Sequence, residues 1–226
     1  MAEKKFENAT AGEKLSGYVM RHRTPIIIIT SVIVAAIIVY VVYAAVTSKV
    51  NDKGISQIDT IEYTLTKDSS TLSDTDIEAR RAAAMTSITP YLKKSGIVGV
   101  RANMLAAEIA YERKEYENAK VYWKKASAKG SKSYTAPLAD YNEAVCCEET
   151  GDLANAVKLY GKAADAEEFM LTAHARFSEG RVYEALGDYK NAADAYNKLN
   201  DATPDDTWAH LAKTRLIALK ADGKIE

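Results

Sequence analysis

The hydrophobic residues of this chain follow two patterns. Residues 25–46 form an uncharged run dominated by isoleucine and valine, whereas from Ile55 onward apolar residues recur every three or four positions. The first pattern predicts one continuous apolar helix, and the second predicts a series of amphipathic helices. Because no run of alternating β-branched residues is long enough for a sheet, we expect an all-α protein.

The uncharged run is long enough to cross a membrane. Its 22 residues, from Pro25 to Val46, would form a helix of roughly 33 Å at about 1.5 Å per residue, and the hydrocarbon core of a bilayer is about 30 Å thick. A signal peptide has a shorter apolar region, of about 7 to 15 residues, followed by a small-residue cleavage site. Since the residues around Val46 make a poor cleavage site, the sequence predicts a single uncleaved transmembrane helix over residues 25–46.

The distribution of basic residues predicts the orientation of this helix. Five basic residues precede it and two follow it within a comparable length: Lys4, Lys5, Lys14, Arg21 and Arg23 before, Lys49 and Lys53 after. By the positive-inside rule, residues 1–24 are expected to be a cytoplasmic basic tail and residues 47–226 to lie on the far side. In a bacterium the protein would then be a single-pass protein of the inner (cytoplasmic) membrane with a periplasmic C-terminal domain.

A short motif recurs along the part of the chain that follows. The segment Gly-Asp-Leu-Ala-Asn-Ala at residues 151–156 returns as Gly-Asp-Tyr-Lys-Asn-Ala at 187–192 and, more weakly, as Lys-Glu-Tyr-Glu-Asn-Ala at 114–119. This pattern resembles the tetratricopeptide repeat (TPR), a helix-turn-helix unit of about 34 residues with small and aromatic residues at set positions. The resemblance implies an α-solenoid with repeats over about 100–133, 137–170 and 173–206.

The three copies carry the repeat signature to different degrees. The third copy has Gly180, Tyr183, Gly187, Tyr189, Ala192, Tyr196 and Pro204 at the signature positions. The second has Ala144, Cys147, Gly151, Leu153, Ala156, Tyr160 and Ala163, and the first has Ala107, Ala110, Tyr116, Ala119, Trp123 and Ala126, with Lys114 in place of the turn glycine. We expect the small residues to let paired helices approach each other, and Trp123, Tyr160 and Tyr196 to fill the space beside the next repeat.

The ends of such a solenoid need caps, because its terminal faces would otherwise expose apolar surface. We expect a C-terminal capping helix over 207–221, with its N-cap among the residues from Pro204. Residues 47–75 are expected to form a juxtamembrane helix and a polar loop, and 76–222 the TPR domain. Within that domain, Asp74 or Thr75 would cap a first helix over about 76–88, which Pro90 would end. Together these helices would make a degenerate fourth repeat.

Composition and charge argue against catalysis and nucleic-acid binding. With 30 Lys and Arg against 31 Asp and Glu, the chain lacks the basic excess typical of nucleic-acid-binding proteins. The adjacent Cys146 and Cys147 cannot form a disulfide framework or a spaced zinc site, and the three histidines are scattered. No phosphate loop or nucleophile motif is present. We therefore expect no enzyme activity, no cofactor and no metal site; burial is favoured for Cys147, although a redox role stays open.

The TPR resemblance also implies a binding surface, the concave groove formed by the first helices of successive repeats. The positions expected to line it are Arg101, Met104, Glu108, Tyr111 and Glu112 in the first copy, Leu138, Tyr141, Val145, Glu148 and Glu149 in the second, and His174, Phe177, Arg181, Glu184 and Ala185 in the third. They predict an apolar floor, made by Met104, Tyr141, Val145 and Phe177, beside an acidic rim. The alternative is that Tyr141 and Phe177 pack against neighbouring helices and bind nothing.

The residues of the groove indicate the kind of partner. Chaperone-binding members of the family hold a C-terminal carboxylate with a lysine and an asparagine, but the matching positions here are Met104 and Glu108, so that clamp is absent. A protein partner with apolar side chains and some lysine or arginine fits the charges better. Such partners would be envelope proteins or an exported segment.

The overall arrangement is similar to that of the bacterial ancillary translocon subunit family, which implies a role near protein export and periplasmic quality control. The sequence thus predicts a membrane-anchored TPR adaptor or scaffold in an envelope assembly, in export, outer-membrane biogenesis, or a flagellar or secretion apparatus. Two alternatives stay open. Self-association through the solenoid, or through Ser31 and Ala35 of the span, would make a homo-oligomeric scaffold without a peptide ligand. The reverse topology would make a cytosol-facing receptor on an organelle membrane.

Overall fold

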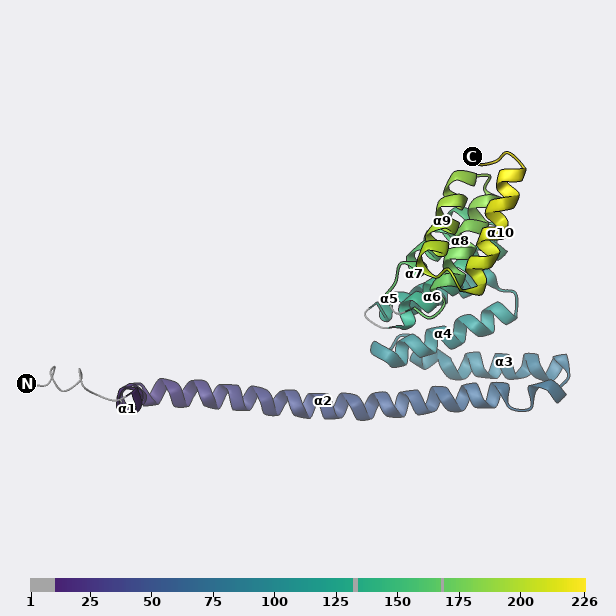
Figure 1. The fold of residues 1–226 in the computed structure, drawn as a ribbon. Coiled ribbons are helices and arrows are strands. Elements are labelled where there is room, and N and C mark those ends of the chain that lie inside the picture. Colours follow the sequence, from purple (N-terminus) through teal and green to yellow (C-terminus); the bar gives the residue numbers. More distant parts are fainter. Residues whose placement is uncertain (1–10, 132–133, 168) are drawn as a thin grey trace, which may run out of the picture. The chain divides into compact units, whose positions relative to one another are not determined.

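The computed structural model describes residues 11–131, 134–167 and 169–226. Within these ranges all regular structure is helical and no strand occurs, which confirms the all-α prediction. The α-helices, in chain order (Figure 1), are α1 (Ala11–Arg21), α2 (Arg23–Thr66), α3 (Asp74–Ile88), α4 (Gly96–Glu112), α5 (Tyr116–Lys129), α6 (Thr135–Glu149), α7 (Leu153–Ala164), α8 (Thr172–Ala185), α9 (Tyr189–Ala202) and α10 (Thr207–Ala221). Short 3₁₀ helices precede and follow α3, η2 (Ser69–Thr71) and η3 (Thr89–Tyr91).

The chain divides into two compact units, and the first comprises residues 1–52. Its described part consists of α1 and the N-terminal portion of α2, which contains the uncharged run. The large apolar side chains from Ile27 to Val46 are exposed. By length and composition, α2 is the one helix in the described part of the chain that could cross a membrane.

The second unit, residues 53–226, is a solenoid of paired helices. From α4 to α10 each helix packs against the next one in the sequence, as Figure 1 shows. This sequential packing is the arrangement that a tandem repeat of helix pairs produces, because each repeat buries its apolar face against its neighbours.

The C-terminal part of α2 belongs to the first core of this unit. Ile58 and Ile88 are fully buried with Leu105 of α4. A Cβ atom at Gly54 would lie 2.8 Å from Cγ2 of Val98, so the glycine allows α2 to approach α4 closely. The pair formed by α2 and α3 therefore covers apolar surface of α4, as expected for the N-terminal end of a solenoid.

Small residues allow the two helices of a repeat to approach each other, as the repeat signature predicts. Ala107, Ala144 and Gly180 are buried. A Cβ atom at Gly180 would lie 2.5 Å from Cε1 of Tyr196, which is too close for any side chain. The aromatic residue of the second helix, Tyr196 in this repeat, fills the space that the small residue leaves.

The turns inside the three repeats share one backbone conformation. Gly151 and Gly187 both have φ of 75°, and Lys114 at the matching position has φ of 61°. In each turn a backbone N–H reaches back to a carbonyl of the preceding helix: Glu115 to Ala110 at 2.9 Å, Asp152 to Cys147 at 2.8 Å and Asp188 to Tyr183 at 2.9 Å. The substitution of glycine in the first repeat therefore leaves the turn geometry unchanged.

Side chains cap helices at both ends of the second unit, and the cap near its N-terminal end makes α3 begin earlier than predicted. α3 begins at Asp74, and its N-cap is Ser73 rather than Asp74 or Thr75. The Ser73 hydroxyl accepts the Asp76 N–H at 3.2 Å and donates to the Asp76 carboxylate at 2.6 Å. This reciprocal pair satisfies two groups at the helix start, which favours the earlier boundary. At the other end of the unit, Asp206 caps α10 by accepting the Trp208 N–H at 2.7 Å.

Candidate functional site

One pocket of the solenoid gathers seven of the fifteen residues that the sequence assigned to the groove. It has a volume of about 460 Å³ and lies between α6, α8 and α10. We call it the α6–α8 pocket, and its lining residues are Tyr141, Val145, Glu148, Glu149, Tyr160, His174, Phe177, Ser178, Arg181 and Trp208. The structure therefore brings together the predicted residues Tyr141, Val145, Glu148, Glu149, His174, Phe177 and Arg181.

The other predicted groove residues lie outside this pocket. Met104 packs against the core formed by α4, α5 and α6. Leu138 is half-buried, and Glu184 accepts hydrogen bonds from Tyr196 and Arg215. Glu108 and Tyr111 lie on α4, one repeat before α6 in the sequence. Burial, with Glu62 adding to it and Arg101 opposing it, raises the pKa of the Glu108 carboxyl to about 7.

Tyr141 is largely buried in the wall of the α6–α8 pocket and does not form an exposed groove floor. Only 9% of the residue is exposed, and its ring contacts those of Tyr160, at a centroid distance of 5.3 Å, and Phe169, at 6.3 Å. Its hydroxyl lies 3.0 Å from Nδ1 of His174. The structure therefore favours the packing role that the sequence left as an alternative for this residue, whereas Phe177 is only half-buried.

The capping helix contributes a side chain that sequence reasoning assigned only to the cap. Trp208 stacks on His174 with ring centroids 3.9 Å apart and an interplanar angle of 6°, and it also contacts Phe177 at 5.3 Å. Burial, and then the positive charge of Arg181, lower the pKa of His174. A neutral imidazole therefore lies between the Tyr141 hydroxyl and the indole. The signal for Trp208 was its place in the first turn of a helix that follows a complete repeat.

The predicted acidic rim is internally neutralised at two positions. Tyr160 donates to Oε2 of Glu148 at 2.6 Å, and Arg181 of the next repeat donates to the same oxygen at 2.7 Å. One repeat later, Tyr196 donates to Glu184 at 2.5 Å and Nε of Arg215 donates to the same oxygen at 3.0 Å. We call this repeated arrangement the Tyr–Glu–Arg ladder. Sequence reasoning missed it because the arginine comes from a different helix pair.

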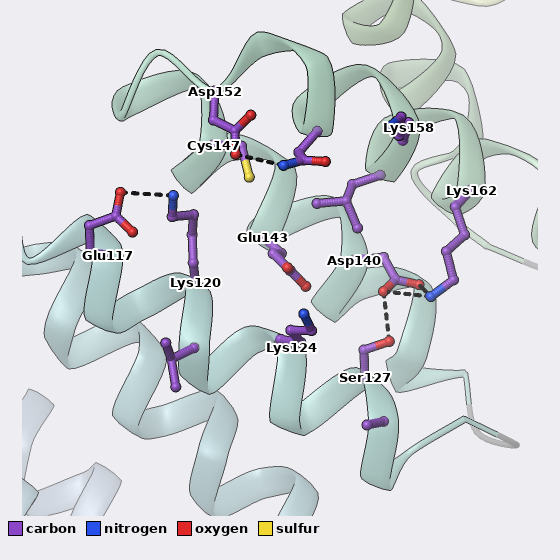
Figure 2. Close-up of a pocket in the computed structure, with 14 residues that line it drawn as sticks. Glu117, Lys120, Lys124, Ser127, Asp140, Glu143, Cys147, Asp152, Lys158 and Lys162 are labelled. Carbon is purple, nitrogen blue, oxygen red and sulfur yellow. Dashed lines mark hydrogen bonds and ion pairs between the residues drawn. The ribbon is translucent and has the colours of Figure 1, made fainter.

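A second concavity, which we call the charged pocket, lies among α5, α6 and α7 (Figure 2) and has a volume of about 620 Å³. Four lysines and four acids line it: Lys120, Lys124, Lys158, Lys162, Glu117, Asp140, Glu143 and Asp152. Figure 2 shows Ser127 and Lys162 converging on the buried Asp140, at 2.6 Å and 2.8 Å. Because the charges balance, this pocket offers no net attraction to an anion or a cation.

Cys147 also lines the charged pocket, next to Cys146 in the sequence. Both thiols are free and buried. Burial raises the pKa of Cys146 to about 12 and that of Cys147 to about 11. In the part of the chain that the structure describes, no group of three metal-ligating side chains is found.

Comparison with known proteins agrees with the helix-pair architecture. Residues 149–207, which include the turns at Gly151 and Gly187, match the tetratricopeptide repeat family. A TPR repeat-containing protein of Treponema pallidum (strain Nichols) is 35% identical over 130 residues. That alignment covers 58% of this chain and 54% of the relative, so the chain spans about half the length of the curated relative that it matches. The matched segment, the relative and the sequential packing of helix pairs together support a tetratricopeptide-repeat protein.

Proposed function

We propose that this protein is a membrane-anchored adaptor that binds a segment of another protein in the α6–α8 pocket. Tetratricopeptide repeats imply a role in protein–protein interaction. The observation that carries the proposal is the convergence of three half-buried apolar side chains, Val145, Phe177 and Trp208, on a pocket that opens to the surface. Aromatic residues are enriched in protein interfaces, and tryptophan is enriched among binding hot spots.

The membrane anchor is part of the proposal. It is supported by the long apolar helix, whose side chains from Ile27 to Val46 are exposed in the first unit. The basic residues that precede this run support a cytoplasmic N-terminus and a periplasmic solenoid in the bacterial inner membrane. There the adaptor would serve an envelope assembly concerned with export, outer-membrane biogenesis, or a flagellar or secretion apparatus.

Site-specific photo-crosslinking in cells tests the adaptor function. A photoreactive amino acid would replace Val145 in the pocket and, as a matched control, Lys190, which is exposed at the start of α9. We expect one distinct envelope protein to be captured from the pocket position and not from the control. Crosslinks only between copies of this chain would favour a homo-oligomeric scaffold, and equal capture from both positions would contradict the proposal.

A reporter fused after Glu226 tests the orientation. An enzyme that is active only outside the cytoplasm, such as a periplasmic phosphatase, should be active in the fusion. Activity of a cytoplasm-dependent reporter at the same position would refute the proposed topology and favour a cytosol-facing receptor.

A further inference from the structure

The Tyr–Glu–Arg ladder is missing from the pair formed by α4 and α5, which is the first of the three repeats. Where the later pairs have Tyr160 with Glu148 and Tyr196 with Glu184, the matching positions of the first pair hold Trp123 and Tyr111. Indole has no hydroxyl to donate to a carboxylate at this position, and Tyr111 has no carboxylate to receive an arginine. The self-neutralised pattern of the later repeats is therefore absent here.

Two tyrosine rings come together at this interruption. Tyr111, at the end of α4, and Tyr116, at the start of α5, have ring centroids 5.2 Å apart at an interplanar angle of 62°. Both side chains are half-buried, so part of each ring faces the surroundings. The electron-rich faces of tyrosine rings attract ammonium and guanidinium groups.

The carboxylate of Glu149 lies close to these two tyrosines. The Tyr116 hydroxyl donates a hydrogen bond to the Glu149 carboxylate. Burial, and then the charge of Glu149, raise the pKa of both Tyr111 and Tyr116. Glu149 is exposed and makes no ion pair with the residues that the structure describes, whereas the neighbouring Glu112 is paired with Arg81 at 3.0 Å. One negative charge without an ion-pair partner among the described residues thus lies close to the two tyrosines.

Glu149 also lines the α6–α8 pocket, one helical turn after Val145. Residues four apart on a helix have Cβ atoms about 5–6 Å apart, so the carboxylate and the apolar part of the pocket can be reached by neighbouring side chains of one partner segment. Within the pocket, the charge of Glu148 is matched by Arg181 at 2.7 Å. The pocket therefore carries a net negative charge at its Glu149 end.

We propose that Tyr111, Tyr116 and Glu149 form a subsite for a lysine or arginine side chain of the partner, and that an adjacent apolar side chain of the same segment enters between Val145 and Phe177. This inference rests on the proposed function, because it specifies the chemistry of the segment that the pocket binds. The ion pair supplies selectivity for a cation, and the rings supply selectivity for a side chain that can lie across them.

Selection from a random dodecapeptide phage library tests the subsite. The full chain in detergent would be used as wild type, as Glu149→Gln and as the control Glu117→Gln, which changes an exposed acid on α5 in the charged pocket. We expect wild type and the control to enrich peptides with a lysine or arginine near an aromatic or aliphatic residue. Glu149→Gln should keep the apolar preference and lose the basic one.

A direct affinity measurement completes the test. One selected arginine peptide and its citrulline counterpart would be titrated against each variant. Glu149→Gln should weaken binding of the arginine peptide about 1.5- to 5-fold, the effect of losing an exposed ion pair. Tyr111→Leu should weaken it about 2- to 5-fold, the effect of losing a cation–π contact, and the double variant about 3- to 30-fold. The citrulline peptide should bind all variants alike. Because an exposed ion pair is screened by salt, the preference for arginine should also shrink as the ionic strength rises.

The outcomes separate the two proposals. Peptides that bind through apolar residues without basic enrichment, or a basic preference that survives Glu149→Gln, would overturn the subsite and leave the adaptor function standing. No peptide selected by the wild-type chain, together with no partner captured from Val145, would overturn both.

Discussion

At the scale of single residues, the turn between α4 and α5 contains backbone strain that the other turns avoid. Lys114 adopts φ of 61° at the position where Gly151 and Gly187 have 75°. A left-handed conformation costs a residue with a Cβ atom roughly 1–2 kcal/mol, whereas glycine adopts it freely. The turn is therefore formed despite its sequence, because the hydrogen bond from Glu115 and the packing of the two helices require it.

Lys114→Gly should therefore stabilise the second unit. Relief of the left-handed strain exceeds the extra chain entropy of glycine, about 0.5–1 kcal/mol, so the free energy of unfolding should rise by about 0.5–1 kcal/mol. Chemical denaturation followed by circular dichroism would measure this. Lys114→Ala removes the same side chain but keeps the strain, and an equal gain in that variant would contradict the explanation.

The two cysteines give a second prediction at this scale. With thiol pKa values of about 12 for Cys146 and about 11 for Cys147, very little thiolate exists near neutral pH, and thiolate is the reactive form. Iodoacetamide should label the folded chain at about pH 8 far more slowly than the chain unfolded in urea. Mass spectrometry would follow the labelling, and rapid modification of the folded protein would instead support a redox role.

At the scale of helix pairs, the distance between the two helices of a repeat depends on a small residue opposite an aromatic one. Gly180 faces Tyr196, which is completely buried. The ring also donates its hydroxyl to Glu184 on the same helix as Gly180. Packing and hydrogen bonding thus hold α8 and α9 in one relative position.

Gly180→Ala should loosen this pair. The new methyl group would overlap the Tyr196 ring, and overpacking of this kind costs typically 1–3 kcal/mol, which exceeds the helix-propensity gain of alanine, about 1 kcal/mol. Gly161→Ala is the matched control, because its Cβ atom would meet only the flexible Glu179 side chain, at 3.0 Å. Thermal unfolding should show a loss for the first variant and no loss for the second; equal behaviour would contradict the packing argument.

At the scale of the whole second unit, the Tyr–Glu–Arg ladder connects successive helix pairs. Glu148 of α6 holds Arg181 of α8, and Glu184 of α8 holds Arg215 of α10. Burial alone would raise the pKa of Glu184, but hydrogen bonds from Arg215 and Tyr196 outweigh it and keep the pKa below its ordinary value of 4.5. A carboxyl group with a lowered folded-state pKa stabilises the protein above its unfolded pKa and loses that contribution as the pH falls through the folded value.

Glu184→Gln should consequently destabilise the unit in a pH-dependent way. At about pH 7 the loss should be about 1.5–3 kcal/mol, the size of hydrogen bonds to a charged group. Below pH 4.5 the difference between wild type and variant should shrink, because the wild-type carboxyl becomes protonated as well. Urea denaturation at several pH values would measure this. Asp194→Asn on α9 serves as control, and a constant difference across the pH range would contradict the role of the charge.

Local patterns in the sequence were enough to predict the helical class, the repeats and the packing of Gly180 against the second helix. Each depends on residues close together in the chain or on a position that recurs with the repeat. The uncharged run likewise predicted the long apolar helix, since helix length and hydropathy follow from consecutive residues. The groove residues were predicted from the TPR resemblance, which implies the positions of each repeat's first helix that line the concave face.

Only the tertiary structure decided what the groove contains. It buried Tyr141 among other rings, brought Trp208 from the capping helix against His174, and neutralised Glu148 with Arg181 from the next repeat. Among the described residues, it gave Glu149 no ion-pair partner beside Tyr111 and Tyr116. These outcomes depend on which side chains of different repeats meet, and hence on the rotation and spacing between repeats. Periodicity along one helix contains no information about either, so the charge and depth of the pocket follow from packing.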